Sequence, residues 1–122
     1  MTTPLHQVKA EFFKTLSHPL RIRVLELLSE SEHSVGELLA EIEVEASNLS
    51  QQLAVLRRAG LVATRKEGST VHYSLVSPQI AELMSVARSI LTSVLSERVD
   101  VLTTLRSDAR NSRGGQIRRG AR

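Results

Sequence analysis

Apolar side chains recur every three or four residues along most of the chain, a pattern typical of helices that bury one face. A first helix is predicted to begin at Pro4, because proline at the first helical position costs no hydrogen bond, and its apolar stripe reaches Leu16. Residues 17–19 separate it from a second helix. That second helix, over residues 20–28, is apolar around most of its circumference, which is typical of the buried centre of a domain.

Two further helices are predicted in the middle of the chain. Ser34 and Glu37 form the S-x-x-E pattern of a capping box, so a short third helix should begin there. A turn at residues 43–45 leads into a fourth helix over residues 46–59. Gly60 follows it directly and is a good C-terminal stop.

Alternating polar and apolar residues follow the fourth helix. The segments 61–66 and 70–75 are joined around Gly68 and predict a two-stranded β-hairpin with one buried face. The fold class is therefore expected to be mainly α, with one small hairpin. Within residues 34–75 the predicted order is short helix, tight turn, helix and hairpin.

The last helix is predicted to begin at Pro78 and to keep an apolar stripe as far as about Arg106. Polar residues at positions 97–98 interrupt the stripe, so one long helix and two shorter pieces both fit the pattern. A helix of that length carries more apolar surface than one small domain needs. A second subunit is its natural partner.

Composition excludes several classes of protein. A length of 122 residues allows one domain, and 41% hydrophobic with 24% charged residues is ordinary for a globular chain. The absence of cysteine excludes disulfides, thiolate metal sites and thiol nucleophiles. The first residues lack the plan of a secretory signal and no apolar run could span a membrane, so we expect a cytoplasmic protein.

The positive charge is concentrated at the C-terminus. The formal net charge is +3, but residues 107–122 hold five arginines against Asp108, which leaves residues 1–106 at −1. That segment has one large apolar residue and two consecutive glycines, so we expect a domain over 4–106 and a disordered tail over 107–122. The tail fits two roles, an arm that strengthens DNA binding and a solubilising terminus.

The fourth helix carries the chemistry that points to a function. Leu49, Leu53 and Leu56 define its buried side, so the opposite side of its N-terminal half is polar and uncharged. Short groups that both donate and accept hydrogen bonds suit base edges in the major groove of DNA. The candidates for base contacts are Ser47, Asn48, Ser50, Gln51 and Gln52. For any one of them, a helix cap or a solvated side chain is an equally good interpretation.

Basic side chains flank this polar surface. Arg57 and Arg58 end the fourth helix, and Arg65 and Lys66 lie on the predicted hairpin. All four could neutralise backbone phosphates, which gives affinity without sequence information. Taken together, the turn, the polar helix face and the basic hairpin predict a DNA-binding protein.

These segments resemble a known family. The run SNLSQQLAVLRRAGLV at 47–62, the entry segment FKTLSHPLRIRVLELL at 13–28 and the hairpin at 65–75 are similar to those of the ArsR-type (arsenic-repressor-like) bacterial winged helix-turn-helix regulators. The resemblance covers about residues 5–95. It implies a repressor that binds a pseudo-palindromic, double-stranded operator as a homodimer joined through its first and last helices. The expected dimer contacts are Leu5, Val8, Phe12, Leu83, Ala87, Ile90, Leu91 and Val94.

The departures from the family pattern concern metal sensing. Many members bind thiophilic metals through a Cys-x-Cys pair at the positions of Ser34 and Gly36, and others bind zinc through Asp and His on the last helix, whereas no histidine follows His72 here. The resemblance therefore implies a regulator without the usual metal ligands, and we expect no cofactor. Glu43 replaces a glycine that relatives often have in the turn, and Gln52 replaces a histidine, which bears on base preference.

Other functions have weaker support. None of the four histidines has the i, i+4 partner of a helical metal pair, and His18, His33 and His72 are predicted at a helix boundary, in a loop and on the hairpin. The chain shows no nucleophile–base arrangement and no glycine-rich phosphate loop, so we do not expect an enzyme. Two alternatives remain open, a winged-helix module that binds a protein partner and a regulator that responds to a small organic ligand.

Overall fold

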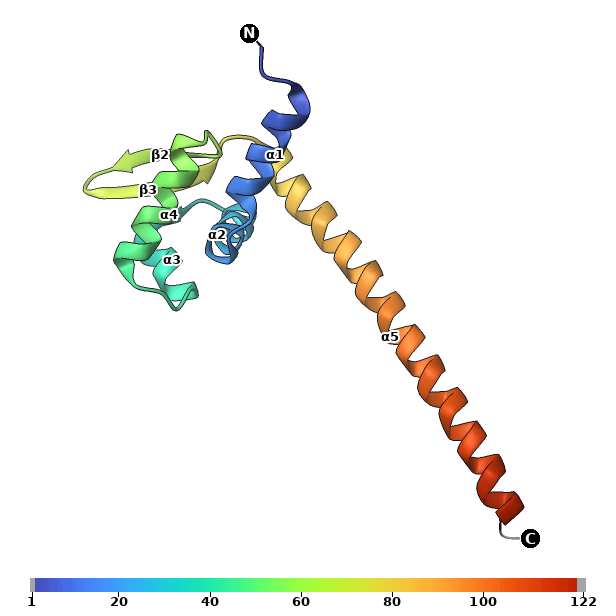
Figure 1. Ribbon diagram of the computed structural model, residues 1–122. Coiled ribbons are helices and arrows are strands. Elements are labelled where there is room, and N and C mark those ends of the chain that lie inside the picture. Colours follow the sequence, from blue (N-terminus) through green and yellow to red (C-terminus); the bar gives the residue numbers. More distant parts are fainter. Residues whose placement is uncertain (1, 121–122) are drawn as a thin grey trace. The chain divides into compact units, whose positions relative to one another are not determined.

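The computed structural model describes residues 2–120 of the chain, and side chains as far as residue 111 (Figure 1). It contains two compact units, which meet in sequence between Ser85 and Val86. The helices in the described residues are α1 (Leu5–Leu16), α2 (Pro19–Glu30), α3 (Val35–Glu41), α4 (Ala46–Arg58) and α5 (Pro78–Gly120). The strands are β1 (His33–Ser34), β2 (Val62–Glu67) and β3 (Thr70–Leu75).

The helix boundaries follow local capping chemistry. At the start of α2, His18 is the N-cap and its Nδ1 accepts a hydrogen bond from the backbone N–H of Leu20 at 3.2 Å. The predicted capping box is confirmed, because Ser34 Oγ accepts from the N–H of Glu37 at 3.2 Å and Glu37 Oε1 accepts from the N–H of Ser34 at 2.9 Å. Gly60 follows α4 with a φ of 78°, a conformation that favours glycine. Short-range signals therefore place these helix ends.

One apolar core holds the first unit together, and α2 contributes four of its buried residues. Val24 and Leu25 have no exposed surface, as the circumference of that helix predicts. The three leucines of α4 and Leu38 of α3 pack into the same cluster. Ile80 and Leu83 bring the first turns of α5 onto it. The core therefore fixes α3 and α4 against α2.

The sheet has three strands, in the order β1-β3-β2, where the sequence predicts a two-stranded hairpin. β2 and β3 pair antiparallel with Val62 opposite Leu75, and Gly68 in the connecting turn has a φ of 63°. The additional strand is β1, whose His33 pairs with Tyr73. The expectation that His33 lies in a loop is therefore wrong. A two-residue strand is too short to show an alternating pattern, so the sequence gives no sign of it.

α5 is one continuous helix from Pro78 to Gly120, so the alternative of two shorter pieces is excluded. The helix also includes residues 107–120, most of the predicted disordered tail, and residues 121–122 lie outside the described residues. Extending an existing helix adds a hydrogen bond for each residue fixed, without the cost of a new nucleus. Among the described residues, no helix is both long enough and apolar enough to cross a membrane.

Candidate nucleic-acid interface

The face of α4 opposite its leucines is polar and open to solvent. Leu49 and Leu53 are at most 1% exposed, whereas Ser47, Ser50 and Gln51 are exposed. The hydrogen bonds found among the described residues leave these three side chains unused. α4 therefore presents free, uncharged donors and acceptors from its first half, as the sequence predicts.

The turn between α3 and α4 keeps that face in place without a glycine. Ile42, at the end of α3, has a φ of −122°, and Glu45, before α4, has a φ of −63°. In the described part of the chain only glycines have a positive φ, so Glu43 occupies ordinary backbone. The glycine that relatives often carry here is not required by this turn.

Gln52 has a structural partner that the sequence does not indicate. The residue is half-buried, and its Oε1 accepts a hydrogen bond from Arg21 Nε of α2 at 2.8 Å. Its Nε2 donates to Asn48 Oδ1, one turn earlier, at 3.2 Å. Arg21 is held further by its Nη1, which donates to the backbone carbonyl of Thr15 at 3.0 Å. In this structure Gln52 and Asn48 brace α4 against α2, and base contact by either residue stays a prediction.

Two of the predicted phosphate contacts lie beside an open hollow. Arg57 and Arg58 are exposed in the last turn of α4, and with Ser50, Ala54 and Tyr73 they line a hollow of about 470 Å³. Tyr73 lies in the middle of β3 and was not singled out from the sequence, since its alternating position indicates only a buried face. The hollow joins the polar face of α4 to the wing, which is the hairpin of β2 and β3.

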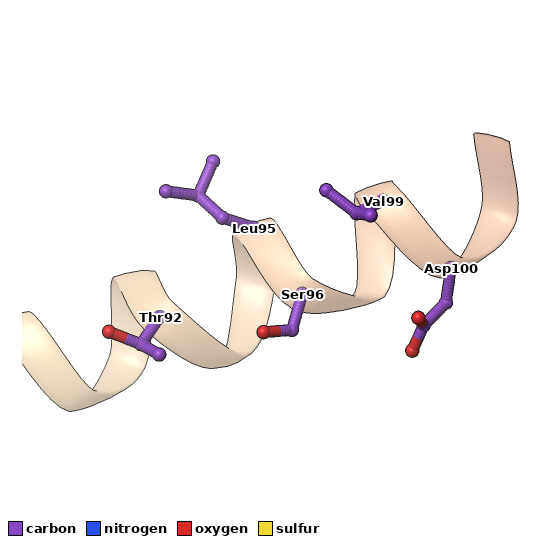
Figure 2. A pocket seen from close by; sticks show the side chains of 5 residues that line it. All are labelled: Thr92, Leu95, Ser96, Val99 and Asp100. Atoms are coloured by element: carbon purple, nitrogen blue, oxygen red, sulfur yellow. The ribbon is translucent and has the colours of Figure 1, made fainter. Parts of the chain in front are cut away.

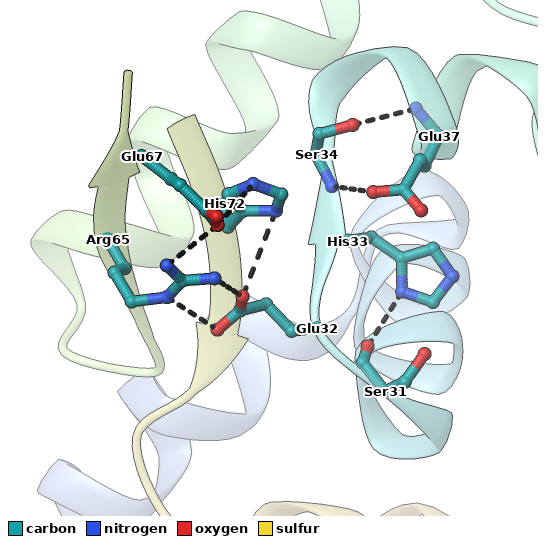
Figure 3. Close-up of polar contacts among 8 residues, drawn as sticks. All are labelled: Ser31, Glu32, His33, Ser34, Glu37, Arg65, Glu67 and His72. Atoms are coloured by element: carbon teal, nitrogen blue, oxygen red, sulfur yellow. Dashed lines mark hydrogen bonds and ion pairs between the residues drawn. The ribbon is translucent and has the colours of Figure 1, made fainter. Parts of the chain in front are cut away.

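Arg65 lies in a different environment from the one expected. Figure 3 shows its guanidinium between the carboxylates of Glu32 and Glu67. Nη2 and Nε donate to the two oxygens of Glu32, and Nη1 donates to Glu67 Oε2 at 3.0 Å. The hydrogen bond from Arg65 lowers the pKa of Glu32, and hydrogen bonds to Glu32 and then Glu67 raise the pKa of Arg65. Lys66, the other predicted phosphate contact of the wing, is exposed.

His72 lies close to both carboxylates that bind Arg65, and with them it forms a cluster of four side chains. Its Nδ1 lies 3.8 Å from Glu32 Oε1 and its Nε2 lies 3.7 Å from Glu67 Oε2 (Figure 3). Nevertheless, the described residues contain no group of three His, Asp or Glu side chains arranged to hold a metal ion. The surface around Arg65 is therefore of mixed charge, because Glu32 and Glu67 offset the positive charges of Arg65 and Lys66.

The expected dimer contacts fall into two groups. Phe12 and Leu83 are half-buried and pack against the core of their own chain. The others are exposed, including Leu5 at 66% and Ile90 at 57%. Phe13, which was not among the predicted contacts, is also exposed and makes an edge-to-face contact with Phe12.

Further apolar surface continues along α5. Figure 2 shows Leu95 and Val99 beside Thr92, Ser96 and Asp100, and these five residues line a hollow formed by α5 alone. A second hollow, lined by Val94, Glu97, Arg98, Val101 and Leu102, also belongs to this one helix. Each is a groove between side chains spaced three and four residues apart. This part of α5 therefore has apolar side chains that its own unit does not cover.

Gln52 and Gln51 are neighbours with different expected roles, and stability measurements separate them. Gln52→Ala removes the acceptor of a half-buried arginine, so we expect the free energy of unfolding to fall by about 1–3 kcal/mol. Gln51→Ala is the matched control and should change it by less than about 0.5 kcal/mol, because its side chain is exposed. Urea unfolding followed by circular dichroism, at one protein concentration, measures both. Equal values would contradict the bracing role.

Comparison with known proteins agrees with this architecture. Residues 18–64 match the model of the family described as "Bacterial regulatory protein, arsR family". The chain is 61% identical to the HTH-type transcriptional regulator Rv0081 of Mycobacterium tuberculosis over 85% of its own length and 92% of the relative's. The crystal structure of Rv0081 matches with a TM-score of 0.74, over 80% of this chain and 99% of that one.

Two further relatives have more descriptive names. A biofilm growth-associated repressor of Agrobacterium fabrum is 42% identical over 66% of this chain and 69% of the repressor. A solution structure from Mycobacterium bovis, described as a homodimeric winged helix-turn-helix DNA-binding domain, matches with a TM-score of 0.68 at 27% identity, over 76% of this chain and 85% of that one. The chain therefore belongs to the arsR family of bacterial regulatory proteins, and it is a transcriptional regulator rather than an enzyme.

Proposed function

We propose that the chain represses transcription by binding a pseudo-palindromic DNA operator as a homodimer, with α4 in the major groove. The observation that carries this proposal is the exposed, uncharged face of α4, which ends in two exposed arginines. A face of this kind combines groups that read bases with groups that hold phosphates. Repression is the direction of regulation in the name of the Agrobacterium relative.

Base reading rests mainly on three side chains. Gln51 can pair bidentately with adenine, and the hydroxyls of Ser47 and Ser50 can donate to or accept from either base edge. All three are exposed on the described surface. Gln52 and Asn48 would act on DNA through the orientation of α4, because their amides are bonded to Arg21 and to each other.

Phosphate contacts anchor the same helix. Arg57 and Arg58 are exposed beside the hollow that α4 shares with Tyr73, and Lys66 extends the basic surface onto the wing. Such contacts fix the register of a protein on the duplex. They also make binding depend on salt, with a slope of about −0.9 in log K against log salt for each phosphate neutralised.

A second copy of the chain would cover the apolar surfaces of α1 and α5. Leu5 and Val8 expose half or more of their surface, and so do Ile90 and Leu91. The Mycobacterium bovis neighbour is described as a homodimer, which supports the same assembly here. A two-fold dimer would present its two α4 helices to half-sites about 34 Å apart, one turn of DNA.

We infer that the signal does not reach this regulator through the family's usual metal positions. Ser34 occupies one cysteine position, and its hydroxyl is already used as the acceptor in the cap of α3. Hydroxyl oxygens are poor ligands for thiophilic metals. No histidine follows His72 in the sequence, so the last helix contains none.

Sequence preference tests the role of α4. Gln51→Ala should lose about 1–3 kcal/mol of discrimination at one base pair, because a bidentate contact is removed. Fluorescence anisotropy with an operator fragment, located by footprinting the regulator's own promoter, and with a scrambled duplex measures this. Gln79→Ala, an exposed glutamine at the start of α5, is the matched control. Equal losses on both duplexes would make Gln51 a nonspecific contact, and binding without a salt slope would refute DNA recognition.

The proposed homodimer can be tested by placing a charge on α5. Ile90→Glu places a charge in the exposed apolar stripe of α5, so we expect monomers in light scattering and at least a tenfold loss of operator affinity. Ser96→Glu introduces the same charge on the polar side of the helix and should leave a dimer (Figure 2). A dimer in both variants would place the interface elsewhere.

Metal dependence can be measured directly. We expect operator affinity to stay within about twofold when zinc, copper or a chelator is added, since the donor set of the usual sites is missing. Elemental analysis of the purified protein provides an independent readout. Stoichiometric zinc, or release of the operator by one of these metals, would contradict the inference.

A further inference from the structure

The wing arginine is already bound to carboxylates. Arg65 uses three of its five N–H groups on Glu32 and Glu67, and two of them form a fork on Glu32. Glu32 lies before β1, at the other edge of the sheet from β2, so the pair bridges the outer strands across β3. The arrangement also encloses His72, the β3 residue opposite Arg65.

Two properties allow a DNA phosphate to replace the carboxylate of Glu32 on Arg65. A phosphate offers the same two-oxygen geometry to a guanidinium as a carboxylate does, so one can replace the other on the same fork. The side chains of Arg65 and Glu32 are 52% and 35% exposed, so water and salt screen the attraction between them. A DNA phosphate would therefore meet a reachable arginine whose present ion pair is screened by solvent.

The two carboxylates of this cluster oppose the approach of the DNA backbone. Arg65 and Lys66 supply two positive charges, and Glu32 and Glu67 supply two negative ones, so these four residues together carry no net charge while His72 is neutral. A carboxylate left beside the DNA backbone after exchange would repel it. Glu32 thus counts against binding twice, by occupying Arg65 and by its own charge.

We propose that Glu32 competes with the DNA backbone for Arg65, so that docking of the wing exchanges this carboxylate for a phosphate. Glu32 then limits affinity on every sequence alike, and operator choice remains with the bases that α4 reads. Without the acid, the wing would hold any duplex more tightly, and the share of binding that depends on sequence would fall. This inference rests on the proposed DNA-binding function.

The test compares two acids that carry the same charge. E32Q removes the carboxylate that holds the fork of Arg65 and leaves only the bond to Glu67, whereas E30Q removes an exposed acid at the end of α2 that forms no hydrogen bond or ion pair with Arg65. On a scrambled duplex and on the operator, we expect E32Q to bind about two- to fivefold more tightly than E30Q, with a salt slope more negative by up to about 0.9. In an Arg65→Gln background, the difference between the two variants should shrink.

An NMR measurement adds a readout that does not depend on affinity. The Nε–H resonance of Arg65 should shift in E32Q and should shift in the wild type when DNA is added, whereas in E30Q without DNA it should stay at its wild-type position. Circular dichroism would establish that all variants keep the wild-type fold.

The outcomes separate this inference from the function beneath it. If the wild type binds DNA with a salt slope but E32Q binds no better than E30Q, the competition by Glu32 is refuted and DNA binding stands. If E32Q binds more weakly than E30Q, Glu32 positions Arg65 instead of competing for it, and the inference is equally refuted. If the wild type shows no salt-dependent binding, both the function and the inference fail.

Discussion

The packing of α4 against α2 is the constraint on which the proposed interface depends. Leu49, Leu53 and Leu56 of α4 share one core with the fully buried Val24 and Leu25 of α2. Because residues of a helix point outward at about 100° intervals, burying those three leucines fixes the rotation of α4 about its axis. The same rotation exposes Ser47, Ser50 and Gln51. The core thus decides which side chains DNA could meet.

Much of this could be predicted from the sequence because the signals are short-range. An apolar period of three to four residues marks the buried side of each helix, and Ser34, Pro19 and Gly60 mark helix ends by their own backbone chemistry. The polar face of α4 follows from its buried face without further information. The resemblance to a family added repression and the pairing of subunits through the first and last helices, which no local pattern contains.

The features that sequence reasoning missed join residues far apart in the chain. Gln52 meets Arg21 from 31 positions away, and Arg65 meets Glu32 from 33 positions away. Neither pair has a periodic signature, and each consists of polar residues whose ordinary interpretation is a solvated surface. Strand β1 was not predicted for a related reason. Its partner β3 lies far along the chain, and two residues are too few to show alternating polar and apolar positions. Composition alone also suggested a disordered tail where the structure extends α5.

These long-range pairs occupy positively charged side chains within the protein. Residues 1–106 have a formal charge of −1, and two of their arginines are engaged within the protein, Arg21 by Gln52 and Arg65 by two carboxylates. Among the predicted phosphate contacts, Arg57 and Arg58 at the end of α4 and Lys66 on β2 are exposed, and no hydrogen bond or ion pair of the described residues involves their side chains. Base reading and part of the phosphate anchoring would therefore fall on the same helix, α4. Anything that rotates α4 against α2 would alter both together, and the Arg21–Gln52 hydrogen bond is one of the contacts that join these two helices.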